Sequence, residues 1–130
     1  MRGTLHFDGS SRPNPGAMQC GFVVKDMNGG LVASGSVQLG QGTNNVAEYK
    51  GLIHGLEAAL SANVMTLAVY GDSRVVIQRM ARTAKKPGKP APHLLPLIEE
   101  ARRLASCFDG ITFNWLGRDN NSEADALSTR

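Results

Sequence analysis

The hydrophobic pattern of this chain changes its period at residues 40–45, and this change constrains the fold more than any other feature. Before it, residues 4–7, 21–25 and 31–39 are apolar or β-branched stretches of strand length. After it, apolar residues follow helical spacing at Tyr49, Leu52, Ile53, Leu56 and Leu60. Asn28-Gly29, between the second and third stretches, favours a tight hairpin turn with positive φ at both positions. The chain is therefore predicted to begin as a three-stranded antiparallel meander, followed by a helix over about residues 45–62.

The rest of the chain alternates between strand and helix patterns. Strands are predicted at residues 65–70 and 111–116, the second with Ile111, Phe113 and Trp115 on one buried face. Helices are predicted after residue 71 and over residues 94–108, on either side of a basic loop at residues 85–92, and a last short helix starts at residue 121. This order predicts an α/β fold in which helices pack on a mixed sheet. The strands that lead into Asp8 and Asp72 are expected to lie side by side and parallel.

Length and composition favour one globular domain over residues 1–130. The chain is 42% hydrophobic and 19% charged, with a formal charge of +3 that permits a polyanionic partner without requiring one.

Cys20 and Cys107 lack the spacing of a metal site and are predicted to be small core residues in a reducing compartment. No stretch has the pattern of a signal peptide or a membrane span. We therefore expect a cytoplasmic protein, and the end of the chain soon after Asp125 indicates a truncated or minimal form.

Four acids, Asp8, Glu48, Asp72 and Asp125, stand where predicted elements start or stop. Each has an ordinary structural explanation: Asp8 as a turn residue, Glu48 in a capping box with Asn45, Asp72 as a helix N-cap, and Asp125 in a second capping box. If all four converge, they form a set of hard oxygen ligands that suits magnesium better than zinc. Such a cluster suits metal-assisted hydrolysis of a phosphodiester.

Spacing removes the other acids from this set. Glu57 follows Glu48 by nine residues, which places it on the opposite helix face. Glu99 and Glu100 lie opposite an apolar stripe and are predicted to be surface residues. Glu123 is two residues from Asp125 and cannot share its face.

Through four motifs, the sequence resembles type 1 ribonuclease H over nearly its whole length. The matching motifs are Asp8-Gly-Ser with Asn14-Pro-Gly, Thr43-Asn-Asn-x-Ala-Glu48-Tyr, Asp72-Ser73, and Arg118-x-x-Asn121-x-x-Ala-Asp125-Ala-Leu. The resemblance implies a five-stranded mixed sheet with flanking helices. It further implies a monomeric endonuclease that hydrolyses the RNA strand of an RNA/DNA hybrid with two magnesium ions, manganese being an alternative.

The resemblance also implies roles for individual residues. The catalytic, metal-binding acids of the family match Asp8, Glu48, Asp72 and Asp125. Residues implied to contact the substrate are Gly9, Ser10, Asn14, Thr43, Asn44, Asn45, Ser73 and Arg74. Among these, the three asparagines match contacts in the minor groove, where 2′-hydroxyls mark RNA, and Thr43 matches part of a phosphate pocket.

Two features, one residue and one loop, depart from the pattern of other family members. Arg118 stands where those members carry a mobile histidine, as in the archaeal-like branch, and because arginine cannot act as a base we expect it to hold phosphate or aid product release. The basic protrusion of some members is reduced to a loop with Lys85, Lys86 and Lys89, which predicts weaker binding with a flatter salt dependence.

Two other functions remain open at this stage. A binding module on the same fold without catalytic activity is disfavoured, since clustered acids do not help a protein to bind a polyanion. A DNA nuclease on the same fold is disfavoured by the asparagines at positions 14, 44 and 45.

Overall fold

A computed structural model of the chain describes residues 1–81 and 88–117. Its elements, in chain order, are β1 (Arg2–Arg12), β2 (Gly16–Asp26), β3 (Leu31–Gly42), α1 (Asn44–Ser61), β4 (Thr66–Gly71), α2 (Arg74–Ala81), the short 3₁₀ helix η1 (Pro92–Leu94), α3 (Leu95–Ala105) and β5 (Gly110–Trp115). The predicted last helix, Arg118, Asp125 and residues 85–87 of the predicted basic loop lie outside the described residues, whereas residues 88–92 of that loop are described.

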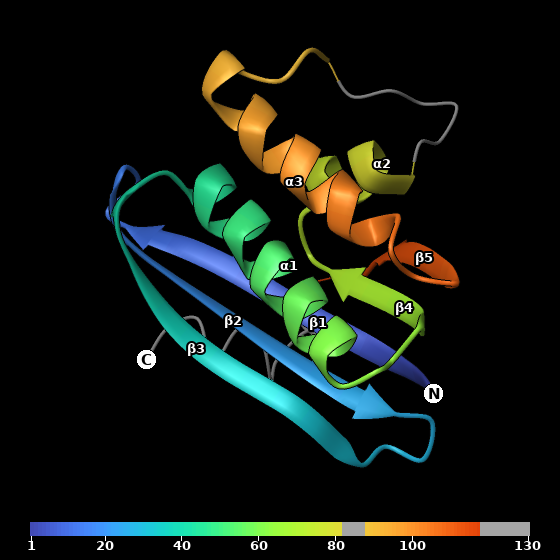
Figure 1. Cartoon of the computed structure of the whole chain (residues 1–130). Helices are drawn as coiled ribbons and strands as arrows, with labels where there is room; N and C mark the ends of the chain where they lie inside the picture. Colours follow the sequence, from blue (N-terminus) through green and yellow to red (C-terminus); the bar gives the residue numbers. More distant parts are fainter. Residues whose placement is uncertain (82–87, 118–130) are drawn as a thin grey trace.

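The five strands form one mixed sheet in the order β3-β2-β1-β4-β5 (Figure 1). β1, β2 and β3 pair antiparallel, whereas β4 is parallel to both β1 and β5. This confirms the predicted meander, the mixed sheet and the parallel pairing of the strands that carry Asp8 and Asp72. The helices α1, α2 and α3 lie together over one face of the sheet (Figure 1).

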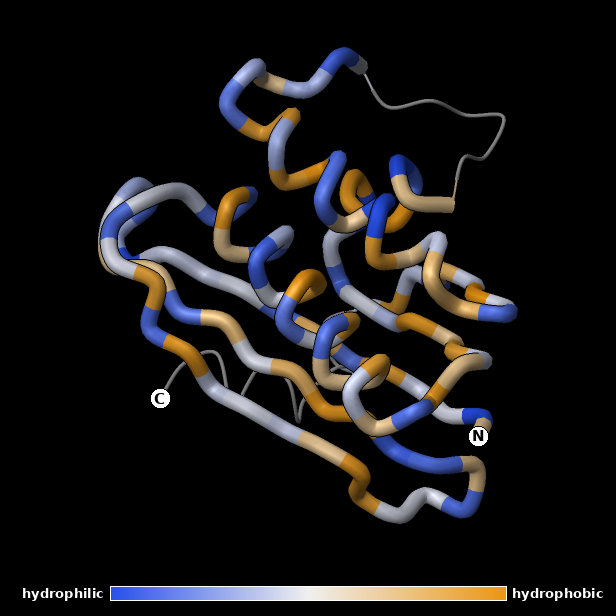
Figure 2. The backbone as a smooth tube through the Cα atoms, in the orientation of Figure 1, coloured by the Kyte–Doolittle hydropathy of each residue, from blue (hydrophilic) through white to orange (hydrophobic). Residues whose placement is uncertain are grey.

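The core lies between the sheet and the helices α1, α2 and α3. Leu5 and Phe7 of β1 and the predicted stripe residues Tyr49, Leu52 and Leu56 of α1 are fully buried in one hydrophobic cluster. Apolar and polar segments alternate along the strands and helices (Figure 2), as expected for elements with one buried face. No described helix is both long and apolar enough to cross a membrane.

Helix α1 begins one residue earlier than predicted, and its cap differs from the prediction. Thr43 is the N-cap, and its Oγ1 accepts a hydrogen bond from the Val46 main-chain N–H at 3.3 Å. The predicted capping box of Asn45 and Glu48 is therefore wrong, which frees the Glu48 carboxylate for another partner. Asp72 is likewise not the cap of α2, because Ser73 Oγ accepts from the Val76 N–H at 3.4 Å.

β1 is longer than the sequence indicates. Asp8 lies in the middle of the strand, which continues to Arg12 and pairs with β2 as far as Ala17. The parallel pairing with β4, however, ends at Phe7 and Gly71. Asp8 and Asp72 therefore each follow the last paired residue, so the predicted meeting of their strands at one edge holds although β1 does not end there.

The predicted hairpin between β2 and β3 forms, but its turn is of another type. Only Gly29 has positive φ (81°), and Asn28 does not. The Asp26 carboxylate accepts hydrogen bonds from the main-chain N–H groups of Asn28 and Gly30 at 2.9 and 2.8 Å. This side chain therefore stabilises a longer loop in place of the tight two-residue turn.

Two predicted core residues are at the surface. Trp115 is 46% exposed and Cys107 is exposed, whereas Cys20 is buried as predicted. Trp115 is the last residue of the edge strand β5, and Cys107 follows the end of α3. Arg74 of α2 covers only part of the Trp115 ring, so alternation along the chain overestimates the burial of this residue.

Candidate active site

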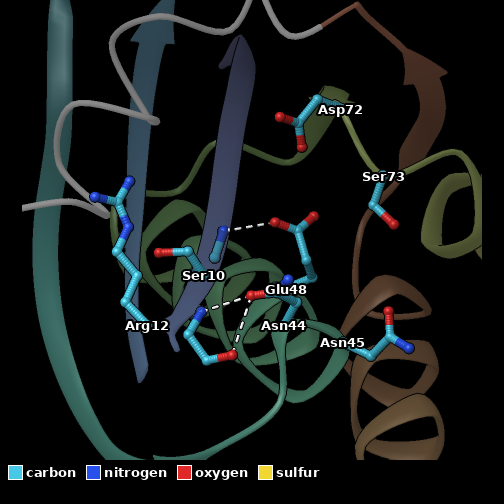
Figure 3. A pocket seen from close by; sticks show the side chains of 9 residues that line it. Ser10, Arg12, Asn44, Asn45, Glu48, Asp72 and Ser73 are labelled. Carbon is cyan, nitrogen blue, oxygen red and sulfur yellow. Dashed lines mark hydrogen bonds between the residues drawn. The ribbon is translucent and has the colours of Figure 1, made fainter. Parts of the chain in front are cut away.

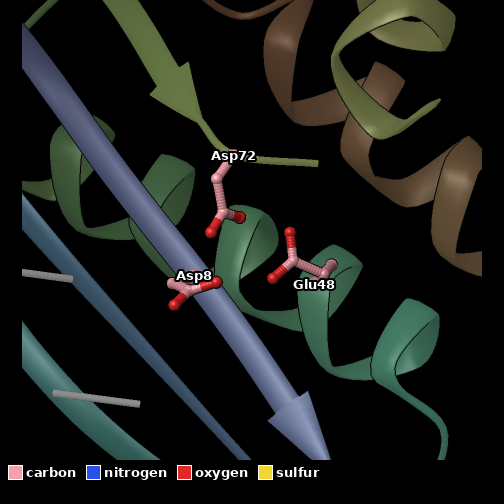
Figure 4. A group of neighbouring side chains, drawn as sticks. All are labelled: Asp8, Glu48 and Asp72. Carbon is pink, nitrogen blue, oxygen red and sulfur yellow. The ribbon is translucent and has the colours of Figure 1, made fainter. Parts of the chain in front are cut away.

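Three of the four predicted acids come together at one edge of the sheet. Asp8 lies on β1, Glu48 on the first turns of α1, and Asp72 just beyond β4; their side chains point toward one another (Figure 4). One carboxylate oxygen from each lies within 4.8 Å of the other two. The sequence-based prediction that these acids converge is therefore confirmed for these three, whereas the fourth, Asp125, lies outside the described residues.

Two glycines allow this convergence by bringing α1 close to β1. A Cβ atom at Gly9 would overlap the main chain of Ala47, and one at Gly51 would lie 2.6 Å from the Asp8 carbonyl oxygen. The close contact places the Glu48 side chain against β1, where its Oε1 accepts a hydrogen bond from the Gly9 N–H at 2.7 Å. The same N–H lies 2.9 Å from Asp8 Oδ1.

The electrostatics of the cluster are those of a cation site. Burial raises the pKa of Glu48 well above its usual range, and the neighbouring carboxylates of Asp8 and Asp72 raise it further. Its second oxygen, Oε2, is buried and has no hydrogen-bond partner among the described residues. Because a buried carboxylate oxygen without a partner is costly, a bound cation is the natural counterpart. An all-oxygen donor set fits a hard divalent metal such as magnesium.

A surface pocket of about 380 Å³ opens beside the cluster (Figure 3). The predicted site residues that line it are Gly9, Ser10, Asn44, Asn45, Glu48, Asp72 and Ser73. Two further lining residues, Ser11 and Arg12, were not predicted as site residues. Both lie at the end of β1, which is longer than the sequence indicates, and the family resemblance implied no role for either.

Three predicted substrate contacts lie next to this pocket without lining it. Asn14 contacts the N-terminus of α1, since its Oδ1 accepts a hydrogen bond from the Asn44 N–H at 3.1 Å. Thr43 caps α1 through its oxygen, which leaves its O–H free to donate to an anion. The Arg74 guanidinium stacks on the ring of Trp115 at 4.4 Å from the ring centroid.

Trp115 is linked to the site in a way that its sequence pattern does not indicate. Its indole Nε1 donates a hydrogen bond to the Asp72 main-chain carbonyl at 3.1 Å. One face of the ring carries Arg74. The indole therefore contacts both the residue that follows β4 and the first residue of α2.

Comparison with known proteins agrees with this fold and site. Residues 6–130 match the family described as reverse transcriptase-like. The chain belongs to this family, and its fold is that of type 1 ribonuclease H.

Individual relatives support that placement. The chain is 40% identical over 129 residues to a bifunctional protein of Mycobacterium tuberculosis, covering 98% of this chain and 35% of that protein. The solved N-terminal ribonuclease H domain of that protein superposes with a TM-score of 0.93 at 36% identity, covering 98% of this chain and 91% of the solved chain. The chain is also 37% identical to ribonuclease HI of Halobacterium salinarum, over 95% of this chain and 60% of that protein. It therefore spans less than two thirds of the length of either relative.

A third solved structure shows a relative with its ligand. LC11 ribonuclease H1, in complex with an RNA/DNA hybrid, superposes with a TM-score of 0.89 at 26% identity, covering 98% of this chain and 94% of that one. The hybrid is thus bound by a protein of the same fold.

Proposed function

We propose that this chain is an endonuclease that hydrolyses the RNA strand of RNA/DNA hybrids with two magnesium ions. The observation that carries the proposal is the convergence of Asp8, Glu48 and Asp72, with one buried oxygen of Glu48 that has no hydrogen-bond partner within residues 1–81 and 88–117. Structural relatives that are named ribonucleases H, one of them bound to a hybrid, support the choice of substrate.

In this proposal the acids hold the metal and the rest of the site holds the substrate. Asp8, Glu48 and Asp72 would bind the cations, with Asp125 as a fourth ligand. The chemistry that bound divalent cations supply is activation of the attacking water and stabilisation of the leaving oxygen. The Gly9 N–H keeps the Glu48 carboxylate directed at the cluster through its 2.7 Å hydrogen bond.

The pocket beside the acids would receive the sugar edge of the minor groove. Asn14, Asn44 and Asn45 are exposed and carry amide groups suited to contacts there. Gly9, Ser10 and Ser73 line the pocket where a bulky side chain would block the duplex. Thr43 would donate to a phosphate, Arg74 would reach the sugar-phosphate backbone, and Arg118 would hold phosphate or aid product release.

Four properties remain predictions: a monomeric state, a single domain over residues 1–130, a cytoplasmic location, and manganese as an alternative metal.

Cleavage of a labelled RNA/DNA hybrid with magnesium tests this function. Single-stranded RNA, duplex DNA and duplex RNA of the same sequence serve as competing substrates. Asp72→Asn should abolish cutting while leaving the fold intact, and Asp109→Asn, an exposed aspartate away from the pocket, should cut like the wild type. Hybrid binding without cutting would instead support the binding module, and preferential cutting of duplex DNA would support the DNA nuclease.

A further inference from the structure

Two of the proposed substrate contacts, Asn14 and Asn44, have side-chain amides whose oxygens accept hydrogen bonds from main-chain N–H groups. Asn44 Oδ1 accepts from the Ser11 main-chain N–H at 2.6 Å, a contact between β1 and the start of α1 drawn among the dashed lines of Figure 3. Asn14 Oδ1 accepts from the Asn44 main-chain N–H at 3.1 Å. A main-chain N–H can only donate, so it must face the amide oxygen rather than the amide nitrogen.

The consequence is that both amides present hydrogen-bond donors to the outside. With each Oδ1 turned toward the protein, each NH₂ group is on the opposite side, and both asparagines are exposed. Pyrimidine O2 and purine N3 are acceptors in the minor groove of any duplex, and the 2′-oxygen of RNA adds an acceptor that duplex DNA lacks. Paired donors therefore match this groove better than a mixture of donors and carbonyl oxygens.

Ser11 is the residue that contacts both amides through its side chain. Its Oγ donates to Asn14 Oδ1 and to Asn44 Oδ1, each at 3.1 Å, and the residue is only 6% exposed. Because a hydroxyl carries a single proton, the two oxygens share it. Ser11 stands near the end of β1, so this one group connects the strand, the turn that carries Asn14 and the first residue of α1.

We propose that Ser11 is a positioning residue that holds the amides of Asn14 and Asn44 as paired donors and thereby favours a duplex with 2′-hydroxyls over duplex DNA. This inference rests on the proposed function for its ligand, the RNA/DNA hybrid. Ser11 does not itself reach the substrate in this proposal. Its hydroxyl adds to the main-chain contacts in opposing rotation of two exposed amides, because a rotated amide would offer a carbonyl oxygen to a groove lined with acceptors.

The first test is binding rather than cleavage. Ser11→Ala removes the hydroxyl but keeps the main-chain N–H that contacts Asn44, so the fold should persist. Affinities for a fluorescein-labelled hybrid and for duplex DNA of the same sequence are measured by anisotropy with magnesium, in an Asp72→Asn background that prevents cutting. The hybrid should bind about 3- to 10-fold more weakly to Ser11→Ala, the size expected for a lost hydrogen bond, while binding of duplex DNA changes less than about twofold.

Two further variants separate positioning from a general loss of structure. Ser11→Cys replaces the hydroxyl with a slightly larger thiol that is a weaker donor, and it should give an intermediate affinity for the hybrid. Ser106→Ala, which removes a hydroxyl hydrogen bond at the end of α3, should leave both affinities unchanged. An equal loss of affinity for hybrid and duplex DNA in Ser11→Ala, or no loss for either, would overturn the proposal.

A double-mutant cycle tests whether Ser11 acts through the asparagines. In a chain that already carries Asn14→Ala and Asn44→Ala, the additional Ser11→Ala change should weaken hybrid binding less than about twofold. A full additional loss would show that Ser11 acts independently of the amides and would overturn the proposal. If the wild-type protein binds the hybrid without cutting it, the proposed function fails while these binding measurements still decide the role of Ser11.

Discussion

The main-chain N–H of Gly9 donates a hydrogen bond to Glu48 Oε1 at 2.7 Å, joining two residues that are 39 positions apart in the sequence. The contact requires α1 to lie directly against β1, because a side chain at residue 9 would occupy the place of the Ala47 main chain. A glycine therefore determines both the packing of the first helix and the direction of one acid in the cluster.

Gly9→Ala is predicted to destabilise the protein and to abolish hybrid cleavage. The added methyl group would push α1 away from β1, at a cost of about 3 kcal/mol or more, the upper range for an overpacked core. Urea denaturation followed by circular dichroism measures the loss. Gly88→Ala is the matched control, since a Cβ there meets no atom of the described residues within 4 Å. Wild-type stability in Gly9→Ala would contradict the packing described for this strand and helix.

Glu48→Gln should remove activity and, without metal, stabilise the fold. Glutamine keeps the oxygen that accepts from Gly9 but replaces a buried charge, whose pKa is raised by burial and by the neighbouring acids, with a neutral amide. We expect a gain on the order of 1 kcal/mol near neutral pH in the presence of EDTA. Glu57→Gln, on the exposed face of the same helix, should change neither stability nor activity. A less stable Glu48→Gln protein would show that burial and the neighbouring carboxylates do not destabilise the charged form of Glu48.

The metal-free protein should lose stability as the pH rises. The pKa of Glu48 lies above its ordinary value in the folded state, so between the two values the folded protein binds more protons than the unfolded chain. Stability is then highest below the ordinary value and falls as the pH rises toward the raised one. Thermal melts in EDTA between about pH 5 and pH 8 measure this trend, which should be weaker in Glu48→Gln.

Magnesium should reverse that trend, because a bound cation replaces the proton as the partner of the cluster. At 10 to 100 times its dissociation constant, a ligand that binds only the folded state contributes about 1.4 to 2.7 kcal/mol. The stabilisation by magnesium should therefore grow with pH over the same range. A metal effect that is constant, or larger at the acidic end, would argue against Glu48 as a ligand.

Much of the fold could be predicted because local patterns and global packing agree. The apolar stripe of α1 and the pairing of the strands that carry Asp8 and Asp72 are visible in the sequence, since each depends on spacing that burial of one face imposes. The same spacing excludes Glu57, which is exposed on the far side of the helix. The convergence of Asp8, Glu48 and Asp72 follows from these two features together.

The errors share a physical cause, which is contact with another helix or strand of the fold. Residues 9–12 have the composition of a turn, yet pairing with residues 17–20 of β2 keeps them in the strand. Glu48 has the spacing of a capping acid, but the Gly9 N–H, brought close by packing, is its partner. Trp115 continues the alternation of its strand, but α2 supplies an arginine instead of an apolar surface. The partners of Glu48 and Trp115 are far away in the sequence, and the nearby residues of β2 reach residues 9–12 only through the pairing of the two strands.

Trp115→Phe is predicted to slow cleavage while leaving the fold intact. Phenylalanine keeps an aromatic face for Arg74 but lacks the N–H that donates to the Asp72 carbonyl at 3.1 Å. Losing that bond loosens the segment that carries Asp72, so we expect a decrease of about 3- to 10-fold in kcat, the size of one hydrogen bond, with a smaller change in KM. Trp115→Leu also removes the stacking of Arg74 and should raise KM in addition. Tyr70→Phe, in β4 and stacked on His6, is the control and should behave like the wild type.

The same residue offers a direct optical readout, because Trp115 is the sole tryptophan of the chain. It is 46% exposed and in contact with Arg74, so a duplex that engages Arg74 changes the surroundings of the indole. Intrinsic fluorescence should therefore shift when a hybrid is added to the Asp72→Asn protein, with a midpoint equal to the dissociation constant from anisotropy. Saturable hybrid binding without any change in fluorescence would place the bound duplex away from Trp115 and Arg74, and would remove both residues from the substrate side of the site.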